Sequence, residues 1–250
     1  SSAEQELVCR GTGIFARLHG KRGIAVHARA RSPIALLADL DALPAGALLI
    51  HAVNADAADI RTLVRKRAHI AHCPTSNAKF GHGIAPLVSF LEAGVDVGLG
   101  SDSVASNNRM DILDEARVAV LSANLRARSP AALTAERALE LATIGGARAL
   151  GVGGVVGSLE VGKSADLAAF RLDAARANPS DDPAATLVFA MGGSRAFLVT
   201  VAGRHLVEHG ELTINPGDLH GRVAAYGRAL RAWRSAQTGG EPSRQTAPIP

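Results

Sequence analysis

The chain has 250 residues, 47% of them hydrophobic, which is enough to bury a full core in one large or two small domains and excludes a wholly disordered chain. Its net charge of +4 comes from scattered arginines, and only 3% of residues are aromatic, so we expect no nucleic-acid partner. No apolar run reaches about 18 residues, and the first residues lack the apolar centre of a signal peptide, which predicts a cytoplasmic protein with no membrane partner.

Helix and strand patterns alternate in the first 70 residues. Apolar residues with helical spacing and short apolar runs predict helices at residues 4–18, 33–40 and 56–67 and strands at residues 23–27 and 48–51. Glycines 11 and 13 interrupt the first helix pattern. Ser32 and Asp56 are suited to cap the second and third helices. Both predicted strands end in a histidine, His27 and His51.

The next stretch repeats the alternation and carries the densest set of polar residues. Two more strands are predicted at residues 69–73 and 95–100, with a helix at residues 86–94 between them and long helices at 108–126 and 130–150. Near-continuous apolar strands that alternate with helices are typical of a parallel sheet, so the fold class is α/β. Loops after parallel strands meet at one edge of the sheet. We therefore expect convergence of five polar residues: His72, Ser76, Asn77, Asp102 and Asn107.

The pattern changes after Gly151. Short apolar runs with glycine turns, including TLVFAMGG at residues 186–193, predict a small β region. The predicted organisation is therefore an α/β part at residues 1–150, a β region at 151–215, a C-terminal helix at 216–236 and a disordered tail at 237–250.

Several motifs occur in an order that resembles the amidohydrolase superfamily, most closely its branch of cytosine deaminases, chlorohydrolases and adenosylhomocysteine deaminases. After His27 and His51 they are HCPTSN (72–77), GIAP (83–86), AGV-x-V-x-LGSD (93–102), SNN (106–108), ATIGGARALG (142–151) and GSLEVGKSADL (157–167). The resemblance covers about residues 20–205. It implies the C-terminal half of a metal-dependent (β/α)8 barrel, with the fifth to eighth strands, followed by part of a β-sandwich.

The resemblance also implies roles for individual residues. His27 and Asp102 are expected to bind the metal, and Asp102 to take a proton from the attacking water. His51 is expected to orient water or substrate, and His72, Ser76 and Asn77 to contact the substrate. A mixed His and Asp ligand set suits Zn, or Fe, better than Mg or Ca. The implied reaction is hydrolysis of a non-peptide C–N bond, with deamination of an aminated ring compound as the default.

Three parts of the family pattern are absent from these 250 residues. There is no His-x-His pair, which would supply two metal ligands; the early barrel strands are not recognisable; and Ala30 stands where the family has a glutamate that protonates the substrate. We therefore expect metal binding to be weak or absent in the isolated chain and catalysis to be impaired. Open sheet edges predict a homo-oligomer, or pairing with an N-terminal barrel half.

Other interpretations stay open. A histidine at a strand end is often only a hydrogen-bonded structural residue, and an aspartate like Asp102 commonly caps the segment after it. Residues 157–164 satisfy the phosphate-loop pattern G-x4-G-K-[ST], although a glycine-rich stretch precedes them and a strand pattern follows. The chain can also be a non-catalytic remnant or subunit that uses the barrel face for binding or assembly.

Overall fold

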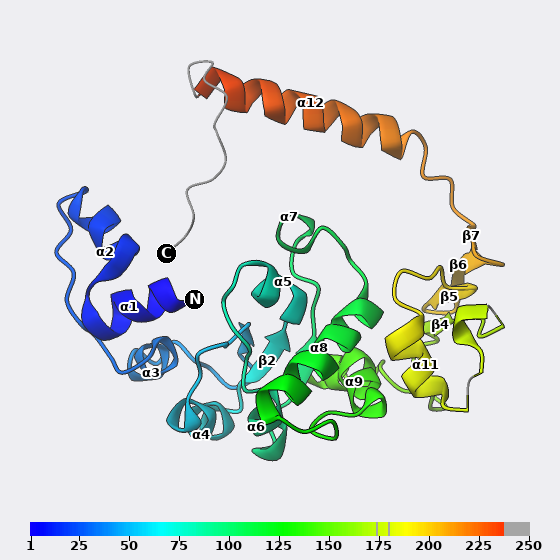
Figure 1. Ribbon diagram of the computed structural model, residues 1–250, viewed down its shortest axis with the longest axis horizontal. Coiled ribbons are helices and arrows are strands. Elements are labelled where there is room, and N and C mark those ends of the chain that lie inside the picture. The colour runs from blue at the N-terminus through cyan, green and yellow to red at the C-terminus, as the bar shows by residue number, and fades with distance from the viewer. Residues whose placement is uncertain (174, 180, 238–250) are drawn as a thin grey trace. The chain divides into compact units, whose positions relative to one another are not determined.

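The computed structural model describes residues 1–173, 175–179 and 181–237 (Figure 1). The described residues up to Gly210 form one compact unit, and residues 211–237 belong to a second. Of the tail predicted at 237–250, only Gln237 lies within the described residues. None of the helices in the described ranges is both long and apolar enough to cross a membrane. The predicted division at residue 150 stays a prediction.

Two helices replace the single interrupted helix expected at the N-terminus. They are α1 (Ser2–Arg10) and α2 (Gly13–Gly20). Gly11 separates them in a left-handed conformation (φ 65°), which glycine adopts without a steric penalty. A side chain there would also meet the backbone of His27, since a Cβ atom on Gly11 would lie 2.9 Å from the His27 carbonyl carbon.

The strand predicted at residues 23–27 is wrong. This segment has no regular structure, and Ile24 is 47% exposed. Just after it, the backbone N–H groups of Arg29 and Ala30 donate to the carbonyl of Val8 in α1, at 2.8 and 3.4 Å. The chain here therefore runs along a helix instead of a sheet. A short apolar run can form a strand only where a neighbouring strand is available, and the run itself does not specify that neighbour.

The other three predicted strands form a parallel sheet in the order β1–β2–β3. Leu49 of β1 pairs with Ile70 of β2, which pairs with Val97 of β3. The strands and the helices of this region are β1 (Leu48–Ile50), β2 (His69–His72), β3 (Val97–Leu99), α3 (Pro33–Asp39), α4 (Ala57–Lys66), α5 (Pro74–Lys79), α6 (Leu87–Glu92) and α7 (Val104–Asn107). The α/β class is confirmed. The segment after β2, expected as a loop, is helix α5, which begins at Pro74.

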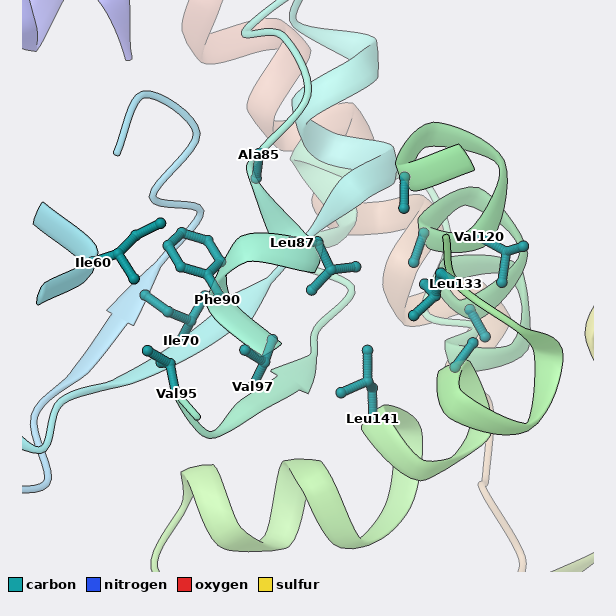
Figure 2. Packing of buried hydrophobic residues seen from close by; sticks show 14 of the residues in the cluster. Ile60, Ile70, Ala85, Leu87, Phe90, Val95, Val97, Val120, Leu133 and Leu141 are labelled. Carbon is teal, nitrogen blue, oxygen red and sulfur yellow. The ribbon is translucent and has the colours of Figure 1, made fainter. Parts of the chain in front are cut away.

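A buried apolar cluster fixes the helices against one face of this sheet (Figure 2). Ile70 of β2 is fully buried and lies beside Phe90 of α6 and Ile60 of α4. Burying a side chain of this size contributes about 1.5–3 kcal/mol. Because side chains alternate along a strand, His72 points to the same helix-covered face as Ile70.

The predicted long helices follow the sheet. They are α8 (Ile112–Ala127), α9 (Ala135–Glu140), the π-turn η1 (Leu141–Gly145) and α10 (Gly146–Ala149). The last three are one nearly continuous helical segment, close to the helix expected at 130–150. Gly98 in β3 allows the sheet to approach it, because a Cβ atom on Gly98 would lie 2.6 Å from the Gly146 Cα.

The region after residue 151 contains an antiparallel sheet with β4 (Leu167–Ala169), β5 (Leu198–Val201) and β6 (Arg204–Glu208), and a short helical turn η2 (Ala175–Ala177). The prediction that TLVFAMGG belongs to the β region is wrong, because most of it lies in α11 (Pro183–Ala190). Asp182 caps this helix by accepting from the Ala185 N–H at 2.9 Å, and Val188 is fully buried in the core.

The second unit contains β7 (Glu211–Leu212) and α12 (Leu219–Gln237). The helix predicted at 216–236 is thereby confirmed as a helix, with bounds that differ by a few residues at its start.

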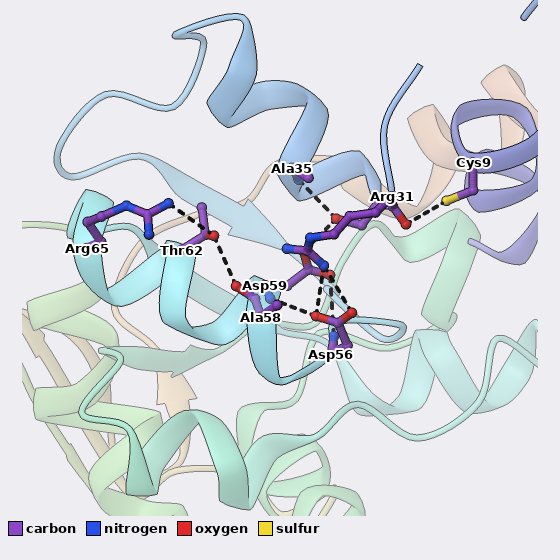
Figure 3. A network of polar contacts seen from close by, with 9 residues as sticks. Cys9, Arg31, Ala35, Asp56, Ala58, Asp59, Thr62 and Arg65 are labelled. Atoms are coloured by element: carbon purple, nitrogen blue, oxygen red, sulfur yellow. Dashed lines mark hydrogen bonds and ion pairs between the residues drawn. The ribbon is translucent and has the colours of Figure 1, made fainter. Parts of the chain in front are cut away.

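A polar network joins the N-terminal helices to α4 (Figure 3). Arg31 donates to Asp59 at 2.7 Å and to Asp56 at 3.0 Å, and its carbonyl accepts from the Cys9 thiol at 2.9 Å. The Ser32 hydroxyl also donates to Asp59, whose side chain is buried. These hydrogen bonds offset the free-energy cost of burying the Asp59 carboxylate, which would be large without partners. Removing Arg31 or Ser32 would leave that charge less well paired, so the network holds the start of α4 in place.

Candidate active site

The carboxyl ends of the three parallel strands bring four of the predicted site residues together. His51 directly follows β1, Ser76 and Asn77 lie in α5 after β2, and Asp102 follows β3. The three short strands and the helices packed on them set these positions, as the sequence predicted for the strand ends.

Asp102 is held as a carboxylate by two donors. Its Oδ2 accepts from the Ser76 hydroxyl at 2.7 Å, and its Oδ1 accepts from the Ser103 backbone N–H at 2.7 Å. These hydrogen bonds, that from Ser76 first, keep the pKa of Asp102 below its ordinary value. The group is therefore ionised at neutral pH and able to accept a proton.

His51 faces this carboxylate. Its Nδ1 lies 2.9 Å from the Asn77 Oδ1, and its Nε2 lies 3.9 Å from the Asp102 Oδ2. The contact with Asn77 fixes the orientation of the imidazole, so its Nε2 lies on the side of the ring that faces Asp102. The side chains of His51 and Asp102 are 34% and 27% exposed, which leaves both open to a small molecule.

The backbone is unusual at both residues. His51 and Asp102 adopt left-handed conformations, with φ of 69° and 57°, as does Ala52 with φ of 42°. Such conformations are uncommon outside glycine, cost free energy, and cluster at functional sites. Sequence reasoning missed this feature, because neither residue type demands it.

Asn107, the fifth residue expected to converge, holds the loop that carries Asp102 through hydrogen bonds. Its Nδ2 donates to the Ser101 carbonyl at 2.8 Å and to Glu115 of α8 at 2.5 Å. Glu115 is buried and also accepts from the Thr75 N–H at 3.1 Å. It thus ties the start of α5 to the loop that carries Asp102. Burial raises the pKa of Glu115. No pattern in the sequence indicates this role for Glu115, since an acid in the first turn of a helix is ordinary.

His72 does not join these residues. Its side chain is 2% exposed and lies on the helix-covered side of β2, where it lines a cavity of about 230 Å³. Neither ring nitrogen has a hydrogen-bond partner in the part of the chain that the structure describes. Burial lowers the pKa of His72 to about 4, so its imidazole is neutral near pH 7.

His27 is also separate from the site. It lies exposed after α2, with its backbone against Gly11, and in residues 1–173, 175–179 and 181–237 its side chain has no hydrogen bond or ion pair with His51 or Asp102. Within the same ranges, no three His, Cys, Asp or Glu side chains are placed to hold a metal ion together. A catalytic zinc takes three protein ligands. The residues that the structure describes therefore do not make a zinc site by themselves.

This arrangement predicts the metal content of the purified chain. After dialysis we expect well under one equivalent of Zn or Fe, because at most two neighbouring protein donors leave most of the coordination shell to water. Elemental analysis by mass spectrometry measures it. Stoichiometric metal that is lost in Asp102→Ala would contradict the prediction and reveal ligands outside the pair of His51 and Asp102.

The phosphate-loop pattern at residues 157–164 has a structural role instead. The Lys163 amine donates to the Gly153 carbonyl at 2.7 Å and to the Ser158 hydroxyl at 2.6 Å. The segment lies in turns, with neither a strand directly before it nor a helix directly after it in this described stretch. A phosphate loop requires both, so the context argues against nucleotide binding.

Comparison with known proteins identifies a family and several relatives of this chain. The model of the Amidohydrolase family matches residues 16–205. A 5-methylthioadenosine/S-adenosylhomocysteine deaminase of Moorella thermoacetica is 37% identical over 217 residues, which are 85% of this chain and 51% of that protein. Another protein of that name, from Desulforudis audaxviator, is 41% identical over 72% of this chain and 41% of its own length.

Solved structures are similar as well. An adenosine deaminase from Xanthomonas campestris with bound zinc has a TM-score of 0.75 and 30% identity, over 94% of this chain and 49% of its own. An atrazine chlorohydrolase from Arthrobacter aurescens complexed with zinc has a TM-score of 0.70 and 32% identity, over 85% and 45% of the two chains. The chain thus spans about half the length of the curated relatives it matches.

Proposed function

Since the chain belongs to the amidohydrolase family, we propose that His51 and Asp102 are part of a hydrolytic site that cleaves a non-peptide C–N bond. The observation that carries the proposal is the ionised Asp102, held by Ser76 and facing His51 across 3.9 Å. In this proposal the three parallel strands correspond to late strands of a (β/α)8 barrel. The small antiparallel sheet corresponds to part of the family's β domain.

The proposed reaction is hydrolytic deamination. Water attacks the ring carbon that carries the amino group, a C–O bond forms and the C–N bond breaks, and ammonia leaves. Asp102 accepts a proton from the attacking water and returns it to the departing nitrogen. His51, fixed by Asn77, accepts a hydrogen bond at Nε2 from the water or the ring and so orients the reacting atoms.

The substrate class follows from the relatives. Their names point to adenine-containing nucleosides and thioethers, so we propose an aminated purine. The zinc in the neighbouring structures supports a divalent metal, Zn or Fe, in the complete site. Because the residues described here do not assemble that metal site, we propose that its remaining ligands come from a complementing N-terminal barrel half or from a second copy of the chain.

The test is reconstitution. The chain is co-expressed with the N-terminal half of the Moorella thermoacetica relative, and ammonia release from 5-methylthioadenosine is followed by a coupled assay. We expect turnover by the complex and little by the chain alone. A folded complex that binds the purine without releasing ammonia would instead support a non-catalytic binding or assembly role.

A further inference from the structure

Helix α12, labelled in Figure 1, carries an apolar stripe along one side. Its members follow one another at spacings of four and three residues, which places them on one face of a helix. Each side chain is more than half exposed, and β7, with two residues, is the one other element in the described part of the same unit. The members of this set, named the α12 stripe, are Leu219, Val223, Tyr226, Leu230 and Trp233.

The α12 stripe contains side chains that are typical of protein interfaces. The chain has a single tryptophan and a single tyrosine, and both lie in the stripe. Large aromatic side chains dominate the energetics of cores and interfaces, and a contiguous exposed apolar patch marks a site of interaction. The composition of the stripe therefore indicates a surface that binds another molecule.

The helix itself also depends on a partner. Gly221 and Gly227 lie within α12, and each glycine destabilises a helix relative to alanine. Most of the stability of a helix in a protein comes from the packing of its apolar face rather than from intrinsic propensity. We therefore expect α12 to be fully formed only where the α12 stripe is covered.

The charges on α12 argue against a second copy of the helix as that cover. Residues 219–237 contain four arginines and neither Asp nor Glu. Arg222 and Arg234 border the stripe on its two sides, because they lie three and four residues from its members. Two copies packed along their stripes would bring these like charges together, which is destabilising.

The width of the stripe argues against a membrane surface. Gly227 and Ala229 lie on either side of its middle, so it is only one side chain wide. A helix that lies in a membrane interface buries a broad apolar face. A narrow seam with alternating spacings of four and three residues is typical of a helix that packs on a protein surface.

The relatives indicate which protein surface this is. The similarity to the zinc-bound adenosine deaminase covers 94% of this chain, and the first unit ends at Gly210 of 250 residues, so the similarity continues into the second unit. This chain in turn covers 49% of that structure. A protein of the same architecture thus contains a further half, without a counterpart in these 250 residues, that can cover the helix.

We propose that the α12 stripe docks in an apolar groove on the N-terminal barrel half that complements this chain. The inference rests on the proposed function for the identity of the partner, but it concerns binding alone. Neither His51 nor Asp102 takes part. Docking and ammonia release are therefore measured separately.

Trp233 reports directly on the stripe, because it is the only tryptophan of the chain. The full chain is labelled with 5-fluorotryptophan, and the unlabelled N-terminal half of the Moorella thermoacetica relative is titrated into it. We expect a saturable change of the ¹⁹F signal of Trp233 and protection of its indole from quenching by acrylamide. Phosphatidylglycerol vesicles should change neither.

Variants on opposite sides of α12 identify the docking face. Leu230→Gln places a good helix former in the stripe, and we expect affinity for the N-terminal half to fall about tenfold or more, as the loss of a buried leucine from an interface does. Arg228→Gln introduces the same residue on the opposite side and should bind within about twofold of the parent chain. Val223→Gln serves as the second stripe variant if Leu230→Gln does not fold.

Four results would overturn the proposal. They are no binding of the N-terminal half, binding that leaves the Trp233 signal unchanged, equal affinities of folded Leu230→Gln or Val223→Gln and Arg228→Gln, and protection of Trp233 from acrylamide in the dilute isolated chain, where the stripe would already be covered. Ammonia release by a complex with an unchanged Trp233 signal would leave the proposed deamination intact. Docking without ammonia release would support the present inference and count against the deamination.

Discussion

Asp102→Ala is expected to lower kcat for ammonia release about 10²- to 10⁴-fold in the reconstituted complex, the usual contribution of a positioned general base. Asp102→Asn should be nearly as damaging. Asparagine tolerates the left-handed backbone seen at this position (φ 57°) and can still accept the hydrogen bond from Ser76, so this variant removes the charge while it preserves the conformation. Steady-state kinetics with an aminated purine measure the effect.

Asp96→Asn provides the matched control, because Asp96 precedes β3 at the opposite end from Asp102 and pairs with His69 at 3.5 Å. Its kcat should equal that of the parent complex. If Asp102→Asn retains full activity in a correctly folded complex, Asp102 is not the proton acceptor, and the role assigned to it in the proposed reaction is wrong.

The free energy of unfolding should decrease as the pH is lowered, and the buried His72 imidazole should contribute part of that decrease. Burial lowers the pKa of this imidazole from its usual value of 6.5 to about 4. Between these two values the unfolded chain binds the proton and the folded chain does not, so the free energy of unfolding falls as the pH falls. The contribution is complete above about pH 6.5, and about 3 kcal/mol of it is lost by about pH 4.

Urea denaturation at pH 7 and pH 5 tests this expectation. From the same pKa shift, His72 should account for about 2 kcal/mol of the loss between these two values. In His72→Phe the loss should be smaller by that amount, whatever the variant's stability at pH 7. His220→Gln changes an exposed histidine of α12 and should leave the pH dependence as it is. Parallel pH profiles for the parent chain and His72→Phe would show that His72 titrates normally.

Local patterns predicted much of the fold. The capping signal of Asp56 and the apolar stripe after it gave α4, and the apolar runs that end near His72 and Gly100 gave β2 and β3. These signals reside in a few consecutive residues and are confirmed by the structure. They also bring together His51, Asn77 and Asp102, since parallel strands must end at one edge.

The failures have a common physical origin in contacts between distant residues. The run at residues 23–27 is as apolar as a strand, but backbone groups just after it bond to Val8 of α1. The TLVFAMGG segment has strand-like composition, yet the Asp182 cap and burial of Val188 favour a helix. Glu115 and the cavity beside His72 depend on α8 reaching α5, which no short pattern encodes.

The exposed edge of the sheet at β1 is a place where a strand of another chain can pair. Leu48 and Ile50 are 39% and 59% exposed, and β1 pairs only with β2 among the described strands. An unpaired edge offers backbone donors and acceptors to another strand. This supports the proposal that a complementing barrel half or a second copy adds to the sheet beside β1.

At His51 and Asp102 the residue that would best stabilise the left-handed backbone differs from the residue that the proposed reaction needs. Judged by the backbone alone, glycine would be the favoured residue at both positions, because it adopts φ of 69° and 57° without a steric penalty. Glycine, however, carries neither a ring nitrogen nor a carboxylate. A lineage that no longer needed the reaction would gain stability by losing these two side chains, whereas one that needs it must tolerate the strain. The residues found at positions 51 and 102 in near relatives thus record whether the chemistry has been under selection.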